Sequence, residues 1–263
     1  MSPWPATPDP WTALGRHTAA RIALGRAGGS LPTNEVLKFS FEHAQARDAV
    51  HSDLDMKRLR ADMASLGLPV VEVKSRVTDR LVYLQRPDLG CELDEQSRVE
   101  LDRQSSVHGE GFDLVLIVAD GLSATAAQCH AAAVLADVVP QFQRDRVRPA
   151  PLVLARFARV GLQDPIGELL HARASLILLG ERPGLRTAQS LGAYLVFNPR
   201  PGNTNAQRNC VSNIWPGGLK PADAAATLHY LVMESLQRKI SGVGLKDERG
   251  RKLSEVQAGL MKE

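Results

Sequence analysis

Four short segments of this chain carry the residues most suited to binding a ligand. Each is rich in Gly, Asn or Arg and follows an apolar run; the segments are 120–123, 158–161, 180–185 and 198–202, the last of which leads into 208–213. Between Arg182 and Ala222 the chain has four arginines and one lysine but no Asp or Glu. Glycine-rich turns expose backbone N–H groups, and beside arginines these groups suit a phosphate or another ligand rich in hydrogen-bond acceptors.

Each segment also has a purely structural interpretation. Asp120 could only cap the helix that follows it, and Gly-Glu-Arg-Pro-Gly at 180–184 could be a tight turn in which Glu181 pairs with its own arginine. Cys210 could be a small buried apolar residue. The arginine-rich stretch could be a solvated face or a protein interface. The position of all four segments directly after predicted strands favours a ligand site.

The sequence contains no motif of a self-sufficient catalytic site. It has no Walker A loop, no Gly-x-Ser-x-Gly, no His-Glu-x-x-His, and no Gly-x-Gly-x-x-Gly after a strand. The seven histidines are scattered, and Cys91, Cys129 and Cys210 lie too far apart for a disulfide framework or a structural zinc site. We therefore predict that the site binds a ligand, with no catalytic residue and no metal ligand of its own.

From residue 68 onward, short apolar runs alternate with helical patterns, and these elements must position the four segments. The predicted strands are 70–73, 81–84, 112–118, 152–157, 175–179 and 193–197, and the predicted helices are 124–139, 164–170 and 222–240. The runs at 112–118 and 175–179 are apolar rather than alternating, as strands buried on both faces of a parallel sheet require. The pattern predicts a doubly wound, Rossmann-like or flavodoxin-like α/β domain over 70–263. Because ligands of such folds bind at the carboxyl ends of the strands, the strand ends after 157, 179 and 197 should face one common cavity.

The first 69 residues predict a small helical domain with a proline-rich arm. Four prolines within residues 1–11 disfavour a helix in that arm. Thr33 is the expected N-cap of a helix that buries Leu37, Phe41 and Ala44, and a second helix is expected over 54–66.

Composition limits the classes of partner and the compartment. With 263 residues, 44% of them hydrophobic and 23% charged, the chain matches an ordinary globular protein. A net charge of +3 is too small to indicate nucleic acid binding. No apolar stretch approaches the ~18 residues that cross a membrane, and the N-terminus lacks the pattern of a secretory signal. We expect a cytoplasmic protein.

Several stretches together identify a family. They are Ala-Arg-Ile-Ala-Leu-Gly-Arg-Ala-Gly-Gly at 20–29, Tyr-Leu-Gln-Arg-Pro-Asp-Leu-Gly at 83–90, Asp-Gly-Leu-Ser at 120–123, Ile-Gly-Glu at 166–168, Gly-Glu-Arg-Pro-Gly-Leu at 180–185, Arg-Asn-Cys-Val-Ser-Asn-Ile at 208–214 and Gly-Gly at 217–218. The Gly-Glu-Arg-Pro-Gly turn would be weak alone, but the order and spacing of the segments at 180–185 and 208–214 are specific. Over nearly its whole length the chain resembles the small subunits of ethanolamine ammonia-lyase.

The resemblance implies a carbon–nitrogen lyase that depends on adenosylcobalamin and converts ethanolamine to acetaldehyde and ammonia by radical elimination. In this family the cobalamin lies between the small subunit and a large TIM-barrel subunit, which holds the substrate and the catalytic residues. The resemblance implies cofactor contacts at Val160, Glu181 and Cys210. It also implies a base-on cofactor, because none of the seven histidines belongs to the Asp-x-His-x-x-Gly motif that supplies a lower axial ligand to cobalt elsewhere.

Alternatives remain beside this family assignment. A stand-alone corrinoid carrier or chaperone would also bind the cofactor, while an independent α/β enzyme with a nucleotide cofactor is disfavoured by the missing phosphate loops. Some family members carry a long N-terminal extension associated with a bacterial microcompartment. Only a short, proline-rich segment precedes Arg16 here, so location inside a microcompartment stays an open alternative to the free cytoplasm.

Overall fold

The two most apolar runs form the centre of a six-stranded sheet in the computed structural model, which describes residues 6–18, 20–108 and 111–249. These central strands are β2 (Phe112–Ala119) and β4 (Ala172–Gly180), and they pair in parallel. β3 (Leu152–Arg156) and β1 (Val70–Lys74) continue the parallel part on the other side of β2. The strand order is β1-β3-β2-β4-β5-β6. The prediction of an α/β fold with a parallel central sheet is confirmed.

The last two strands depart from the prediction, since β5 (Leu191–Phe197) and β6 (Arg208–Ile214) run antiparallel to their neighbours. Only residues 181–190 join β4 to β5, and this connection is too short for the crossover of a dozen or more residues that a parallel pair needs. The segment at 208–214, interpreted from the sequence as a loop, is the edge strand β6. The carboxyl end of β5 therefore lies beside the start of β4, at the end of the sheet where the parallel strands begin.

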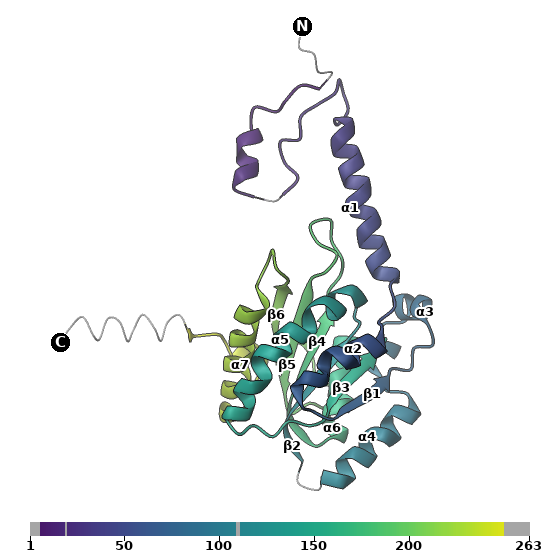
Figure 1. Cartoon of the computed structure of the whole chain (residues 1–263), viewed down its shortest axis with the longest axis vertical. Helices are drawn as coiled ribbons and strands as arrows, with labels where there is room; N and C mark the ends of the chain where they lie inside the picture. Colours follow the sequence, from purple (N-terminus) through teal and green to yellow (C-terminus); the bar gives the residue numbers. More distant parts are fainter. Residues whose placement is uncertain (1–5, 19, 109–110, 250–263) are drawn as a thin grey trace, which may run out of the picture.

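Helices cover both faces of the sheet (Figure 1). α5 (Ala124–Arg144) and α7 (Pro221–Arg238) pack on one face, where Leu114, Leu116 and Val118 of β2 belong to their core cluster. α4 (Glu95–His108) and α6 (Gln163–Leu169) lie on the other face, with Val115 and Ile117 in their cluster. This two-sided burial explains why the central strands lack the alternating pattern of half-exposed strands.

One predicted strand is wrong, because residues 81–84 belong to helix α3 (Arg80–Gln85). Asp79 is its N-cap, and the Asp79 carboxylate accepts a hydrogen bond from the backbone N–H of Val82 at 3.0 Å. Such a cap satisfies one of the free N–H groups of the first turn. The cap and the burial of the Tyr83 side chain outweigh the β propensity of this short run.

At the N-terminal end, helix α1 (Thr33–His51) extends away from the sheet (Figure 1). Pro32 occupies the N-cap position, so the prediction of Thr33 as the cap is wrong. Leu37 and Phe41 are each 64% exposed rather than buried, because no other part of the described chain covers that side of the helix. A short helix, η1 (Thr12–Arg16), precedes α1.

α2 (Met56–Met63) and the 3-10 turn η2 (Ala64–Leu66) return the chain to the body of the protein. Leu59 and Met63 of α2 belong to the same core cluster as α5. The division into a helical domain up to residue 69 and an α/β domain beyond it stays a prediction. None of the helices within the described residues is long and apolar enough to cross a membrane.

Candidate functional site

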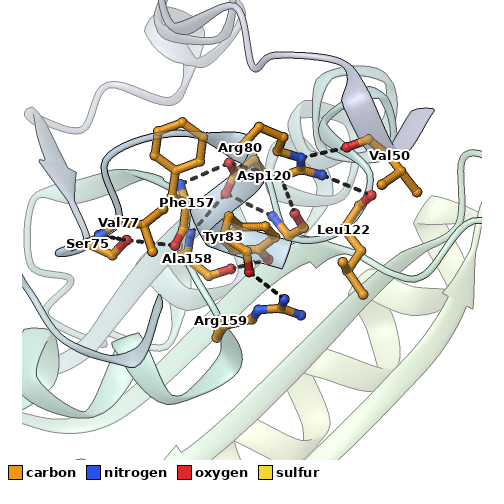
Figure 2. A network of polar contacts seen from close by, with 11 residues as sticks. Val50, Ser75, Val77, Arg80, Tyr83, Asp120, Leu122, Phe157, Ala158 and Arg159 are labelled. Atoms are coloured by element: carbon orange, nitrogen blue, oxygen red, sulfur yellow. Dashed lines mark hydrogen bonds and ion pairs between the residues drawn. The ribbon is translucent and has the colours of Figure 1, made fainter. Parts of the chain in front are cut away.

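The carboxylate of Asp120, at the end of β2, holds the ends of two strands together. It accepts hydrogen bonds from the backbone N–H groups of Phe157 at 2.9 Å, of Ala158 at 3.0 Å and of its neighbour Gly121 at 3.0 Å (Figure 2). Ser123, rather than Asp120, caps α5, since its hydroxyl accepts from the N–H of Ala126. The interpretation of Asp120 as a simple helix cap is therefore wrong: it fixes the loop after β3 against the loop after β2.

Arg80 compensates the buried charge of Asp120. Its guanidinium lies 3.7 Å from the Asp120 carboxylate and donates to the carbonyl oxygens of Val50, Gly121 and Leu122. Burial raises the pKa of Asp120 to about 6, and the backbone hydrogen bonds and Arg80 oppose this rise. Because that pKa lies below 7, the carboxyl is mainly ionised at neutral pH.

The loop after β4 lies directly against the loop after β2. The backbone N–H of Leu122 donates to the carbonyl oxygen of Gly180 at 2.9 Å. A Cβ atom on Gly180 would lie 1.9 Å from the carbonyl oxygen of Ser123, and one on Gly121 would lie 2.2 Å from the carbonyl oxygen of Gly180. Both positions therefore require glycine, and the segments at 120–123, 158–161 and 180–185 lie together as predicted.

A cavity of about 410 Å³ opens where these three segments meet; it is lined by Tyr83, Leu122, Arg159, Val160, Leu179, Gly180, Glu181, Arg182 and Tyr194. Val160 begins the short helix η4 (Val160–Leu162) after β3, and Glu181 directly follows β4. Two of the three predicted contact residues thus line one cavity at the carboxyl ends of parallel strands, where α/β folds bind their ligands.

Hydrogen bonds from two neighbouring elements hold the Glu181 side chain in place. Its carboxylate accepts from the Ser190 hydroxyl at 2.5 Å and from the backbone N–H of Asn213 at 3.1 Å. Glu181 therefore joins the turn after β4 to the end of β6. These contacts, rather than a pair with Arg182, position the carboxylate, which can still accept a hydrogen bond from a ligand.

Cys210, the third predicted contact, lies within β6 and not in a loop. It stands directly opposite Tyr194 of β5, so the two side chains lie on the same face of the sheet. Tyr194 lines the cavity, so Cys210 borders the cavity through this tyrosine. Its side chain is exposed, and the interpretation of Cys210 as a buried apolar residue is wrong.

The fourth predicted segment does not join this site. Residues 198–202 follow β5. They lie where the parallel strands begin, not where they end, because Phe197 pairs with Ala174 near the start of β4. The expectation that the strand ends after 157, 179 and 197 share one cavity is therefore correct for the first two and wrong for the third. The antiparallel direction of β5 is the physical reason.

The cationic side chains of the stretch from Arg182 to Ala222 lie in different parts of the structure. Arg208 forms a buried ion pair with Asp164, with distances of 2.9 and 2.5 Å between guanidinium and carboxylate atoms. Arg186 stacks over the ring of Trp215, 5.9 Å from its centre. Of the five cationic residues, Arg182 is the one that lines the cavity, so the stretch does not act there as a single basic patch.

Sequence reasoning missed the contribution of Tyr83 and Arg159 to the site. Tyr83 lies in α3, which the sequence predicts as a strand, and Arg159 belongs to the predicted segment 158–161 without a role of its own. The Arg159 guanidinium stacks over the Tyr83 ring at 4.1 Å. The Tyr-Leu-Gln-Arg-Pro-Asp stretch beginning at Tyr83 was the available signal, but it did not indicate which residues touch. Within the described residues, no group of three or more His, Cys, Asp or Glu could hold a metal ion.

Comparison with known proteins places the chain in a family. The family model of the ethanolamine ammonia-lyase light chain (EutC) matches residues 8–246. An ethanolamine ammonia-lyase small subunit of Rhodopseudomonas palustris is 50% identical over 235 residues, covering 89% of each chain. One from Xanthomonas campestris pv. campestris is 49% identical over 251 residues, covering 95% of this chain and 92% of the relative. Another from Azotobacter vinelandii is 49% identical over 244 residues, covering 93% and 90%. With these matches over almost its full length, this chain belongs to the ethanolamine ammonia-lyase light-chain family.

Proposed function

We propose that this chain is the small subunit of an adenosylcobalamin-dependent ethanolamine ammonia-lyase, which converts ethanolamine to acetaldehyde and ammonia. The cavity at the ends of β3 and β4 holds the cofactor, in its base-on form, against a large TIM-barrel subunit. The enzyme is active only as this hetero-oligomer. It works in the cytoplasm, either free or inside a bacterial microcompartment.

One observation carries the proposal: Val160 and Glu181, from the ends of two different strands, line one cavity, and Cys210 is paired with Tyr194 in the wall of that cavity. A corrin is too large for this cavity alone, so it would present one edge here and its remaining surface to the partner subunit. The lining offers what a corrin edge needs. Val160 gives apolar contact, Glu181 accepts hydrogen bonds from carboxamide N–H groups, and the Arg159 guanidinium offers a donor.

In this reaction the chain itself binds the cofactor, orients it and helps to enclose it. Bound adenosylcobalamin supplies the radical chemistry of the elimination, as cofactors do for reactions that side chains cannot perform. The rigid contacts of Asp120 with Phe157 and Ala158 fix the cavity wall, which would orient the cofactor toward the large subunit. Closure of the two subunits around it excludes water from the reacting atoms. No acid, base or nucleophile is assigned to this chain.

Helix α1 offers a surface for the large subunit. Its exposed apolar side chains are Val36, Leu37, Phe39 and Phe41. Large apolar side chains gathered on one exposed element mark protein interaction sites, and membership of a small-subunit family supplies the partner. We therefore propose that α1 packs against the large subunit.

Reconstitution tests the proposal. The purified chain is mixed with adenosylcobalamin, with and without the large subunit, while visible absorbance and acetaldehyde release are followed. Turnover and strong cofactor retention only with the large subunit support the proposal. Tight corrinoid binding that the large subunit does not change would support a carrier instead. Binding of a nicotinamide dinucleotide and of no corrinoid would support an independent nucleotide-dependent enzyme.

A further inference from the structure

Arg159, the residue before Val160, is held firmly by its surroundings. Its guanidinium stacks over the Tyr83 ring at 4.1 Å and donates to the Tyr83 carbonyl oxygen at 2.9 Å. Its backbone N–H donates to the carbonyl oxygen of Gly90 at 2.8 Å. Tyr83 is itself fully buried, and its hydroxyl donates to the carbonyl oxygen of Ala158 at 2.9 Å. Arg159 therefore rests on a fixed support and cannot swing freely.

The surrounding chain keeps space for this arrangement. A Cβ atom at Gly90 would lie 2.6 Å from Cγ of Arg159, so any larger residue there would push the arginine away from Tyr83. Arg80 stacks on the same ring, 4.6 Å from its centre, and Figure 2 shows Tyr83 between the two arginines. Arg80 is occupied by Asp120 and three carbonyl oxygens.

Arg159, in contrast, has an unused donor. Its Nη2 atom donates to Tyr83, but among the described residues its Nη1 atom forms no hydrogen bond and no carboxylate forms an ion pair with the guanidinium. The Nε atom also lacks a partner there, but it is closed to solvent, so a ligand would meet Nη1 rather than Nε. A guanidinium carries five N–H donors, and one left free beside a cavity can bind an acceptor atom of a ligand. Arg159 lines the same cavity as Val160 and Glu181. Glu181 is already engaged with Ser190 and Asn213, so an acceptor for Nη1 would come from outside the chain.

We infer that Arg159 donates a hydrogen bond to an oxygen atom of the bound corrinoid, and that stacking on Tyr83 holds the guanidinium ready for this contact. The inference rests on the proposed function. The acceptor is a carboxamide oxygen at the corrin edge or a phosphate oxygen of the nucleotide tail, which share the chemistry that an arginine recognises. A donor held in place before binding loses little conformational entropy when the ligand arrives.

The test measures cofactor binding rather than turnover. The complex of this chain with the large subunit is prepared as wild type, Arg159→Met and Arg159→Lys, with Arg156→Met as the matched control. Arg156 is the last residue of β3 and also stacks on an aromatic ring, that of Phe157 at 5.8 Å, but it lines other cavities. Equilibrium dialysis gives the affinity for cyanocobalamin and for dicyanocobinamide, which lacks the nucleotide tail. Thermal unfolding of each complex without corrinoid reports the stability of the fold.

The expected result is at least about a tenfold weaker affinity of Arg159→Met for cyanocobalamin, the effect of losing one hydrogen bond from a charged donor. Arg159→Lys keeps the charge but lacks the planar donor, so an intermediate loss is expected, and Arg156→Met should stay within about twofold of wild type. A loss with both corrinoids assigns the acceptor to the corrin edge, and a loss with cyanocobalamin alone assigns it to the phosphate.

Two results separate failure of this inference from failure of the proposed function. If Arg159→Met melts at a lower temperature but binds cyanocobalamin as wild type does, Arg159 only supports Tyr83 and the inference is wrong. If the wild-type complex binds neither corrinoid, the proposed function itself fails.

Discussion

At the scale of single residues, Glu181 and Asp120 are two carboxylates with different tasks. Asp120 is buried and engages three backbone N–H groups and Arg80, so it has no free face for a ligand. Glu181 lies in the cavity wall, fixed by Ser190 and Asn213. We expect replacement of Asp120 to lower the stability of the fold, and replacement of Glu181 to weaken binding of the corrinoid.

Substitution of Glu181 by Ala should weaken corrinoid retention by the two-subunit complex by roughly tenfold, because one acceptor near a polar cofactor is lost. Glu181→Gln, which keeps an oxygen for Ser190 or Asn213, should show a smaller loss. Glu168→Ala, at an exposed carboxylate of α6, is the control. Retention is measured as visible absorbance after gel filtration. An Ala variant that retains the cofactor like wild type would remove Glu181 from the site.

The raised pKa of Asp120 predicts a pH dependence of stability. Its pKa of about 6 in the folded state exceeds the ordinary aspartate value of 3.8, so between these pH values the folded state binds more protons than the unfolded state. The contribution of this group to the free energy of unfolding therefore falls as pH rises from about 4 to about 6, and levels off above 7. Relative to wild type, Asp120→Asn should be more destabilised at pH 5 than at pH 7.

Urea unfolding of both proteins at the two pH values gives this difference. Asp88→Asn serves as the control, because Asp88 pairs with Arg86 on the surface and its pKa is lowered by that contact. A destabilisation by Asp120→Asn that is larger at pH 7 than at pH 5 would contradict the assigned direction.

At the scale of elements, the site depends on how closely the loops after β2 and β4 approach. Gly180→Ala would place a methyl group 1.9 Å from the carbonyl oxygen of Ser123. The backbone must shift, so we expect a loss of about 1–3 kcal/mol in stability together with weaker corrinoid binding. Gly184→Ala is the control, since its nearest atom lies 3.9 Å away. Thermal unfolding compares the two, and equal melting temperatures would show that the close approach is not required.

The elements also show what could be predicted from the sequence. The apolar runs of β2 and β4 predicted a parallel sheet covered on both faces. The position of segments 158–161 and 180–185 at the carboxyl ends of strands predicted that they meet, while Val160 and Glu181 themselves came from the family resemblance. The direction of β5 was missed because it depends on the short connection at 181–190. β6 was missed because only Val211 and Ile214 of its residues are buried, which leaves a weak strand pattern. The contact of Tyr83 with Arg159 joins segments far apart in sequence, and no local pattern encodes it.

At the scale of the whole molecule, α1 is the part least explained by the chain alone. Leu37 and Phe41 are each 64% exposed, so replacing them should leave the isolated fold intact. Leu37→Ser with Phe41→Ser should weaken association with the large subunit by at least about tenfold, because buried apolar and aromatic side chains dominate interface energies. Gln45→Ser on the same helix is the control. Sedimentation of the mixed subunits measures the association, and unchanged association would exclude α1 from the interface.

The central claim is that the cavity at the ends of β3 and β4 holds the corrinoid. A crystal structure of this chain with the large subunit and cyanocobalamin tests it most directly. We expect the corrin against Val160 and Glu181, with an oxygen atom within hydrogen-bond distance of Arg159. A corrin bound elsewhere, with this cavity closed by protein side chains, would show that the cavity is not the cofactor site.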